Sequence, residues 1–273
     1  MPAKDDPMSQ IDPSATIHPS SVIDAGAVIG AGVEIGPFCH IGGKVRLGEG
    51  VRVKSHAVVT GDTTVGAGTT IFQFASVGEI PQDLKFRGEE TRLEIGARCR
   101  IREYVTINTG TEGGGGLTKI GDDCLLMASA HVAHDAVIGN RVILVNSVAV
   151  AGHCIIEDDV IVGGLSGIHQ FVRIGQGAIV GALSMVTADV LPHALVQGPR
   201  AELDGLNLVG LKRRGVDRDD INQLRAAFQM LKQGEGSFKD RAQRLSEDFD
   251  STYVAAMVAF VMGASDRGFL TPK

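Results

Sequence analysis

Apolar residues recur at every sixth position along most of the chain. Between residues 120 and 190 the pattern is unbroken, because positions 120, 126, 132 and so on to 186 are all Ile, Leu or Val. The same spacing runs from residue 11 to residue 77 and returns from Ile95 to Ile107. Neither a helix nor a flat strand repeats every six residues, whereas a coil of three short strands and three turns does. The pattern therefore predicts an all-β solenoid, a parallel β-helix, over residues 11–191.

A second regularity describes the interior of this coil. The fourth residue after each apolar position is small throughout: Ala, Ser, Thr, Cys or Val. A narrow three-sided prism requires this, because a large residue beside each inward Ile or Val would overfill it. The four cysteines, Cys39, Cys99, Cys124 and Cys154, all occupy this position. We therefore expect buried thiols and not zinc ligands.

Two polar segments interrupt the pattern. Residues 78–94 contain Pro81 and Gly88 and preserve the sixfold phase, which predicts a loop that leaves the coil at one corner. Residues 112–119 hold four consecutive glycines and shift the phase by one residue, which predicts a short flexible excursion. Such loops are the places where a smooth prism acquires a pocket.

Helical spacing replaces the sixfold pattern beyond Pro192. One apolar helical face is formed by Ile221, Leu224, Phe228 and Leu231. Asp217 is its predicted N-cap and Gly234 its predicted stop, while Ser237 and Ser251 predict two more helix starts. We expect residues 192–273 to form a helical bundle that closes the open end of the coil. Residues 1–10 are expected to be a flexible N-terminus.

Composition agrees with a repeat protein and argues against other classes. Glycine is abundant at 36 residues, tryptophan is absent and aromatic residues make up only 4%, which suits a narrow interior. The net charge of −6 argues against a nucleic-acid partner. The first ten residues lack the apolar core of a signal peptide, and the longest apolar run, 254–264, is too short for a membrane span. We expect a cytoplasmic protein.

Five of the eight histidines lie in or just beyond the second half of the repeat region. Because successive coils are eighteen residues apart, residues at that spacing should stack about 4.8 Å apart. His134, Gly152 and Gln170 then form one column, and Asp135 and His153 form the next. Both columns avoid the inward positions, so we expect this cluster on the surface of the prism.

His134 and Asp135 suit general acid–base chemistry. A histidine titrates near neutral pH, and an adjacent carboxylate can orient it. Gly152, in the same column, leaves a backbone N–H unshielded for an oxyanion. Since no Ser or Cys is placed to form a covalent intermediate, we favour direct attack by an acceptor hydroxyl that His134 deprotonates.

Two other interpretations involve the same histidines. A catalytic zinc needs three protein ligands, which His131, His134 and His153 could supply, as in γ-type carbonic anhydrases built on this kind of coil. Asp135 beside His134, together with the glycine column, favours acid–base chemistry, so we expect no metal and no cofactor. A non-catalytic β-helical scaffold would need no histidine column at all.

Six short motifs resemble the UDP-N-acetylglucosamine O-acyltransferase family of left-handed β-helix acyltransferases. They are FASVGE (74–79), QDLK (82–85), AHVAHD (130–135), AGH (151–153), HQF (169–171) and GLKRRG (210–215). The similarity covers nearly the whole chain. It implies a left-handed β-helix, a homotrimer, and transfer of an (R)-3-hydroxyacyl group from acyl carrier protein to the 3-hydroxyl of UDP-N-acetylglucosamine, the first step of lipid A synthesis.

The resemblance also implies roles for single residues. His134 would be the general base, Asp135 its orienting group and the Gly152 N–H the oxyanion donor. The implied substrate-binding residues are Gln82, Asp83, Lys85, His131, His153, His169, Gln170, Asn207, Arg213 and Arg214. The basic run at 212–214, with Arg173, would also attract an acidic carrier protein. Ala182 falls where the family sets acyl length, and a medium chain is expected.

Two positions depart from the family pattern. Asn108 stands where a histidine is expected, and Val209 stands where an acid is expected. An acceptor with a 3-amino group, which would give an amide, therefore stays open. The N-acyltransferase of the same pathway carries an extra domain before its coil, whereas here the repeat begins at Ile11. Acetyl-CoA-dependent hexapeptide enzymes lack the QDLK motif and the helical tail.

Overall fold

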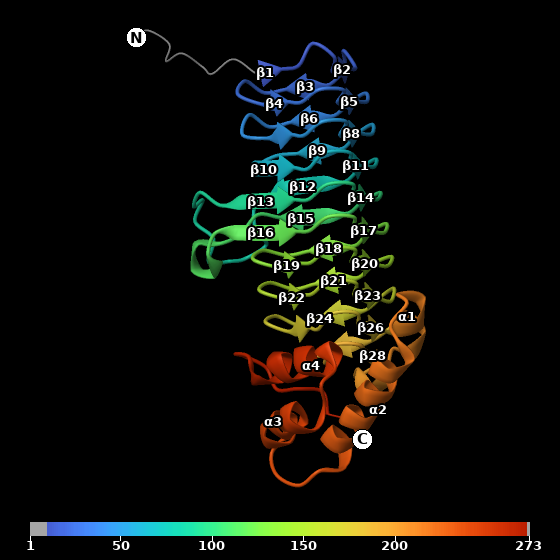
Figure 1. The fold of residues 1–273 in the computed structure, drawn as a ribbon. Coiled ribbons are helices and arrows are strands. Elements are labelled where there is room, and N and C mark those ends of the chain that lie inside the picture. Colours follow the sequence, from blue (N-terminus) through green and yellow to red (C-terminus); the bar gives the residue numbers. More distant parts are fainter. Residues whose placement is uncertain (1–9, 272–273) are drawn as a thin grey trace.

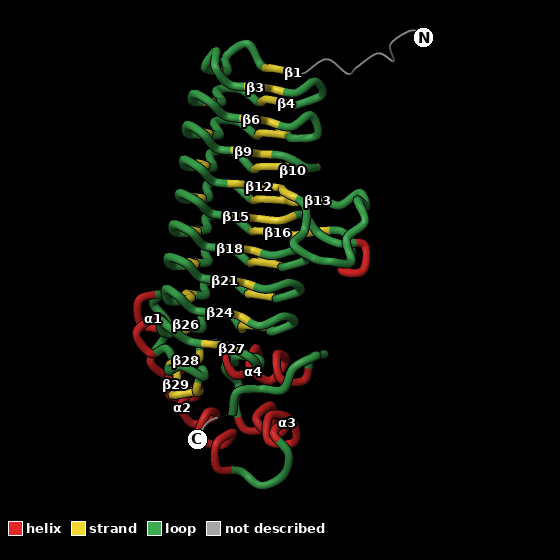
Figure 2. Tube along the Cα trace, turned by 180° about the vertical axis from the view of Figure 1, so that it is seen from behind, coloured by secondary structure: helices red, strands yellow, loops and turns green. Residues whose placement is uncertain are grey.

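The computed structural model of the protein describes residues 10–271, which form a column of stacked coils with four helices at one end (Figure 1; Figure 2). Each coil contributes three strands, and equivalent strands of successive coils pair in parallel, so that the column has three sheets. Of the segment 1–10 that we expected to be flexible, residues 1–9 lie outside the described residues, and Gln10 begins the first strand.

Each sheet collects one strand from every coil. The first sheet contains β1 (Gln10–Ile11), β4 (Val28–Ile29), β7 (Arg46–Leu47), β10 (Asp62–Val65), β13 (Arg92–Ile95), β16 (Leu117–Ile120), β19 (Val137–Ile138), β22 (Ile155–Ile156) and β25 (Arg173–Ile174). The second contains β2 (Thr16–Ile17), β5 (Glu34–Ile35), β8 (Arg52–Val53), β11 (Thr70–Ile71), β14 (Arg100–Ile101), β17 (Leu125–Leu126), β20 (Ile143–Leu144), β23 (Ile161–Val162), β26 (Ile179–Val180), β28 (Ala194–Gln197) and β29 (Glu202–Leu206). The third contains β3 (Val22–Ile23), β6 (His40–Ile41), β9 (Val58–Val59), β12 (Ser76–Glu79), β15 (Thr106–Asn108), β18 (His131–Val132), β21 (Ala149–Val150), β24 (Gly167–Ile168) and β27 (Met185–Val186).

The register of these sheets follows the sixfold pattern. Ile11 pairs with Ile29 and Leu126 with Leu144, which is the eighteen-residue step expected for three strands per coil. The apolar residue of each repeat points inward, and Ile41, Ile101 and Leu144 are fully buried. The parallel β-helix predicted from the spacing is therefore confirmed.

The cysteines lie where the small-residue pattern placed them. All four are free and buried. The Cys39 thiol donates to the Lys54 carbonyl oxygen at 3.0 Å, and the Cys154 thiol donates to the His169 carbonyl oxygen at 3.1 Å. Burial raises the pKa of Cys154 to about 12, so this thiol stays protonated and unreactive at neutral pH. The prediction of buried thiols is confirmed.

The corners of the coil use a backbone conformation that the spacing does not reveal. The corner residue of many repeats has a positive φ although it is not glycine, as at Asp135 (φ 58°) and His153 (φ 60°). This left-handed conformation costs about 1–2 kcal/mol for each such residue. The parallel ladders and the continuous core offset that cost, so the corners hold their side chains in fixed directions.

Both predicted loops leave the coil on the same side and lie close together (Figure 1; Figure 2). The first runs over residues 80–91 between β12 and β13, and the second over residues 109–116 between β15 and β16. Both differ in their bounds from the predicted 78–94 and 112–119. The first loop is shorter at both ends because β12 and β13 each have four residues. The second begins earlier because β15 ends at Asn108, and it ends earlier because β16 has four residues.

The C-terminal helices are α1 (Leu208–Arg213), α2 (Arg218–Gln233), α3 (Phe238–Asp248) and α4 (Thr252–Met262). The predicted caps are confirmed: Asp217 caps α2, Gly234 ends it, and Ser237 and Ser251 begin α3 and α4. Within the described part of the chain, no helix has the length and hydrophobicity needed to cross a membrane.

The expectation of helix from residue 192 onward is wrong for residues 194–206. There the second sheet continues, because β28 pairs in parallel with β26, and β29 then turns back antiparallel to β28. Val180 lies opposite Val196, a step of sixteen residues and not eighteen, so this last coil falls out of the sixfold phase. The hairpin covers the open edge of the second sheet, which would otherwise expose unpaired backbone groups.

A buried ion pair joins the coil to the helices. Arg173 Nε lies 2.7 Å from Asp189 Oδ2, and Asp189 is completely buried. A second guanidinium nitrogen of Arg173 donates to the Phe260 carbonyl oxygen at 3.1 Å, and the guanidinium lies 4.4 Å from the centre of the Phe260 ring. Our expectation that Arg173 attracts a carrier protein is therefore wrong, because its charge is committed inside the protein.

Replacing Asp189 by alanine is expected to lower the free energy of unfolding by about 3–5 kcal/mol, since the change leaves the Arg173 charge buried without its partner. Urea denaturation would measure this loss. The matched control is Glu90→Ala, which breaks the exposed Lys44–Glu90 pair and should leave the free energy of unfolding almost unchanged. Equal effects of the two substitutions would show that the buried pair does not tie the coil to α4.

Candidate active site

A groove of about 430 Å³ lies on the outer face of the third sheet. Its floor is a column of outward-facing residues that lie opposite one another on neighbouring strands. The order along the column is His131, Ala149, Gly167 and Met185. Because the two middle residues are small, the column is hollow at its centre. At its edge the groove reaches the corner between the third and first sheets, where it is lined by Ala133, His134, Ala151, Gly152, His169 and Gln170.

The predicted dyad lies at this corner. His134 Nδ1 is 2.8 Å from Asp135 Oδ2, a hydrogen bond in which the ring donates to the carboxylate. With Nδ1 as the donor, the neutral ring carries its lone pair on Nε2, which has no hydrogen-bond partner among the described residues. A histidine held in this tautomer is suited to accept a proton from a hydroxyl in the groove.

Gly152 lies against the His134 ring. A Cβ built on Gly152 would come within 2.5 Å of His134 Cε1 and 2.7 Å of Nε2, so a side chain at this position would displace the ring. The Gly152 N–H has no acceptor within the described part of the chain. Stacking by eighteen residues therefore brings a free backbone donor beside the candidate base, as predicted.

The prediction that this cluster lies on the surface is wrong for its two central residues. His134 is only 5% exposed and Asp135 6% exposed. Both side chains leave the prism at its corner, but the second loop folds back so that Thr111 contacts the Asp135 carboxylate, while Gly152 and His153 lie against the His134 ring. The sixfold pattern identifies which side chains leave the core, but it does not show what covers them.

Two further histidines face the same site. The His153 ring stacks on Phe171 with centroids 4.5 Å apart, and His153 Nδ1 lies 3.8 Å from Asp135 Oδ2. Burial lowers the pKa of His153, partly opposed by the Asp135 charge. Burial also lowers the pKa of His131, and the neighbouring His134 adds to this. Both rings are therefore neutral at pH 7 and can act as hydrogen-bonding groups.

The first loop brings its predicted residues to this corner. Gln82 lines the groove itself. Asp83 and Lys85 line an adjoining hollow of about 380 Å³ together with Thr111, His153 and Phe171. Segments that are far apart in the sequence thus enclose the dyad on two sides.

Four of the residues predicted to bind substrate or to set acyl length line neither hollow within one chain. Asn207 caps α1 by accepting from the Gly210 N–H at 2.9 Å, and its amide nitrogen donates to the Gly177 carbonyl oxygen at 3.0 Å. Arg214 lies 3.3 Å from the buried His193, whose pKa burial and this guanidinium lower to about 4. Arg213 is exposed on α1. Ala182 lies at the corner between the second and third sheets, three residues before Met185.

The two departures from the family pattern lie in different settings. Asn108 is buried, and its Nδ2 donates to the Ile80 carbonyl oxygen at 3.0 Å, so it secures the base of the first loop. Its Oδ1 has no partner among the described residues. Val209 is 60% exposed on α1.

The side chains around His134 are arranged less suitably for binding a metal than for proton transfer. Among the described residues, potential ligand atoms of His134, Asp135 and His153 lie within 4.8 Å of one another. This differs from the predicted zinc set, because His131 Nδ1 is instead 2.7 Å from Thr106 Oγ1. Both Asp135 oxygens already accept hydrogen bonds from Thr111, which a metal would have to displace.

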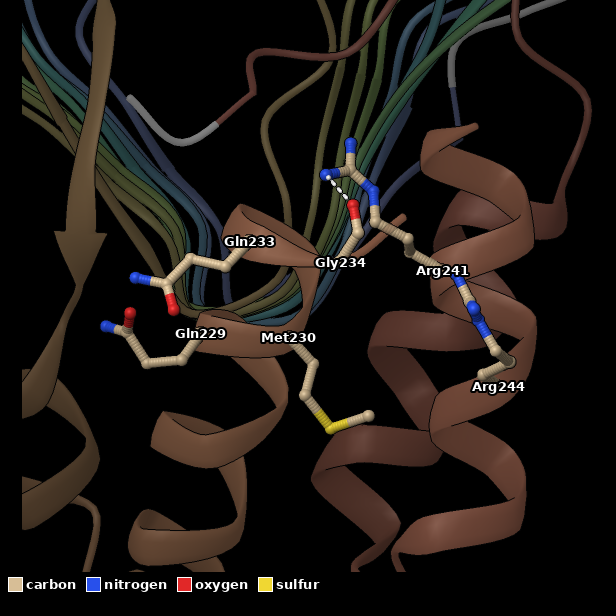
Figure 3. A pocket seen from close by; sticks show the side chains of 6 residues that line it. All are labelled: Gln229, Met230, Gln233, Gly234, Arg241 and Arg244. Atoms are coloured by element: carbon tan, nitrogen blue, oxygen red, sulfur yellow. Dashed lines mark hydrogen bonds between the residues drawn. The ribbon is translucent and has the colours of Figure 1, made fainter. Parts of the chain in front are cut away.

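A separate hollow of about 330 Å³ lies between α2 and α3 (Figure 3). Arg241 on its wall donates to the Gly234 carbonyl oxygen at 3.1 Å, where α2 ends (Figure 3). A cation at a helix C-terminus is stabilised by the helix dipole. This arginine therefore serves to cap α2, and the hollow shares no residue with the groove.

Sequence reasoning missed several residues of the site: Thr111, Thr118, Gly167, Phe171 and Met185. Phe171 could have been found by counting, because it lies eighteen residues after His153. Gly167 and Met185 follow His131 at two and three times this interval. Thr111 and Thr118 carry no such signal, since the second loop breaks the period.

Comparisons with known proteins agree with the resemblance. The model for domain 2 of UDP N-acetylglucosamine O-acyltransferase matches residues 189–270, and the bacterial transferase hexapeptide model matches 26–61 and 117–152. The acyl-[acyl-carrier-protein]–UDP-N-acetylglucosamine O-acyltransferase of Paracoccus denitrificans is 67% identical over 74% of this chain and 77% of its own length. The protein of that name from Rhizobium johnstonii is 48% identical over 80% of each chain.

Solved structures show the same fold. The UDP-N-acetylglucosamine acyltransferase from Campylobacter jejuni is 39% identical and superposes with a TM-score of 0.89, covering 94% of this chain and 100% of that one. A second acyltransferase structure of this name is 42% identical with a TM-score of 0.86, covering 97% and 99%. The coil is thus a left-handed β-helix, and the chain belongs to the UDP-N-acetylglucosamine O-acyltransferase family.

Proposed function

We propose that the protein transfers an (R)-3-hydroxyacyl group from acyl carrier protein to the 3-hydroxyl of UDP-N-acetylglucosamine, the first step of lipid A biosynthesis. The observation that carries this proposal is the His134–Asp135 pair, with His134 Nε2 free at the edge of an elongated groove. The names of the relatives supply the two substrates. We propose that the reaction takes place in the cytoplasm. No step requires a cofactor.

The reaction follows from the geometry of the corner. His134 Nε2 takes the proton of the acceptor hydroxyl. At the same time the hydroxyl oxygen attacks the thioester carbonyl carbon and forms the new C–O bond. The Gly152 N–H donates to the oxyanion of the tetrahedral intermediate. The C–S bond then breaks, and protonated His134 returns the proton to the departing thiolate. Asp135 keeps the ring in the required tautomer and orientation throughout.

The remaining predicted residues are proposed to hold the substrates. Gln82, Asp83 and Lys85 would contact the sugar or the acyl donor from the first loop. His131, His153, His169 and Gln170 line the space around the dyad. Because Asn207, Arg213 and Arg214 do not reach this groove within one chain, we propose that they bind the nucleotide from a neighbouring subunit.

We propose that the subunits form a homotrimer. An exposed column of rings runs along the corner between the second and third sheets, in which Phe38, His56, Phe74 and Tyr104 follow one another with centroids 5.0–5.1 Å apart. Farther along the same corner, Leu165 and Leu183 are 65% and 66% exposed. An apolar surface of this extent is typical of an interface. Sedimentation equilibrium should give three times the chain mass, and a monomer would contradict the proposal.

Acyl length is proposed to depend on Ala182, which lies just beyond the Met185 end of the groove. We expect Ala182→Gly to raise the preference for the next longer chain about tenfold in the ratio of kcat/KM values, because one methylene in an apolar slot carries roughly that discrimination. Gly167→Val should lower kcat/KM for all long chains, since its side chain would enter open space in the groove floor. An unchanged length profile in both variants would place the acyl chain elsewhere.

The function is tested by mass spectrometry of the product made from a mixed pool of hydroxyacyl carrier proteins and two acceptors. These acceptors are UDP-N-acetylglucosamine and its 3-amino analogue. An ester on the first acceptor is the expected product, and an amide on the second would establish the alternative acceptor. Absence of both products would favour a scaffold, while zinc-restored activity after chelation would favour the anhydrase interpretation.

A further inference from the structure

We propose that Thr111 is a positioning residue for the His134–Asp135 pair, and that the glycine-rich segment 110–116 is a cap built to fit over the Asp135 carboxylate. The inference rests on the proposed function, because it assigns a role to the loop through the candidate base. The segment reads Gly-Thr-Glu-Gly-Gly-Gly-Gly, and its length alone would make it an ordinary surface turn.

The contacts of Thr111 define its role. Its backbone N–H donates to Asp135 Oδ1 at 2.8 Å, and its hydroxyl donates to Asp135 Oδ2 at 2.6 Å. Oδ2 also accepts from His134 Nδ1 at 2.8 Å. Asp135 is also held by its backbone, because its N–H donates to the Thr118 hydroxyl oxygen at 2.8 Å. The two threonines that flank the glycines thus hold Asp135 by both its side chain and its backbone.

The glycines allow this close approach. A Cβ on Gly114 would collide with the carboxyl carbon and both oxygens of Asp135, and one on Gly110 would crowd the same carboxylate. Gly115 and Gly116 have φ values of 94° and 75°, which other residues rarely adopt. Gly113, in contrast, has open space around its Cβ position. The composition of the loop therefore follows from packing on one carboxylate.

Thr111 also decides which histidine Asp135 serves. Oδ2 lies 2.8 Å from His134 Nδ1 and 3.8 Å from His153 Nδ1, so a small rotation of the carboxylate would exchange one partner for the other. The Asp135 side chain is 1% exposed, and water does not compete for its oxygens. The hydroxyl of Thr111 fixes the rotation in favour of His134.

The test compares Thr111→Val, which keeps the shape but removes the hydroxyl, with Thr111→Ser, which keeps the hydroxyl. We expect Thr111→Val to lower kcat about tenfold or more while KM for the sugar nucleotide changes less than about twofold, because the base is misplaced and not the substrate. Thr111→Ser should restore most of kcat. In proton NMR, the downfield signal of the His134 Nδ1 proton should weaken or move in Thr111→Val only.

Gly114→Ala is compared with Gly205→Ala, because an added Cβ at Gly205 meets nothing within 4 Å and Gly205 lines neither hollow. The first should reproduce the kcat loss of Thr111→Val, and the second should behave as the unmodified protein. Full kcat in Thr111→Val, with His134→Ala inactive, would overturn the positioning role alone. Full activity in His134→Ala would instead overturn the proposed function. A kcat loss in Thr111→Val that Thr111→Ser fails to restore, with an unmoved NMR signal, would also refute the proposal.

Discussion

Replacing His134 by alanine is expected to lower kcat by about 100- to 10,000-fold, the range associated with the loss of a positioned general base. His134 is the histidine whose Nδ1 is bound to a buried carboxylate and whose Nε2 is unpaired at the groove. The substitution leaves Gly152 and the substrate-binding side chains in place, so KM should change little. Acyl transfer from hydroxyacyl carrier protein, followed by product detection, would measure the loss.

His18→Ala is the matched control for this experiment. It removes an exposed imidazole from the first coils, remote in sequence from the groove, and kcat should be unchanged. Thermal denaturation of both variants would show that the fold is retained. If acyl transfer survives in His134→Ala, the assignment of the base is wrong, whichever substrate the protein uses.

The second large effect is expected for Gly152→Ala, with a loss of about 100-fold in kcat. The added methyl would come within 2.5 Å of the His134 ring and push it from the carboxylate. The Gly152 N–H itself is unchanged by the substitution. The loss would therefore report displacement of the base and not removal of the oxyanion donor.

Gly205→Ala is the control, because a Cβ at that position of β29 meets nothing within 4 Å. Its activity and melting temperature should equal those of the unmodified protein. A Gly152→Ala variant with full kcat would mean that the His134 ring can move without penalty. In that event the ring position seen here is not the one that the reaction requires.

Much of the fold could be predicted because its rule is local and repeated. Within the uninterrupted runs, each inward Ile, Leu or Val has a small residue four positions later, and any slip in register would turn one of these out of the core. The same rule placed the cysteines inside and stacked Gly152 above His134. Helix caps were equally predictable, since Asp217, Ser237 and Ser251 bind backbone groups only two or three residues away.

Other features were not predictable from spacing. The hairpin of β28 and β29 follows a coil of sixteen residues, so the sixfold count ended before the sheet did. Nothing in the sequence around Arg173 distinguishes it from a surface arginine. Only its contacts with Asp189 and the distant Phe260 carbonyl show that its side chain is mostly buried. The contacts that bury the Asp135 carboxylate likewise come from a loop that has no period.

The sequence by itself determined which positions of the repeat point away from the core. It therefore placed His134, Asp135, Gly152 and His153 at one corner. It could do so because stacking converts an interval of eighteen residues into adjacency. Only the tertiary structure decided that Thr111 closes over Asp135 and selects His134 as its partner. That contact joins residues twenty-four apart through a loop outside the repeat, and no periodic pattern records it.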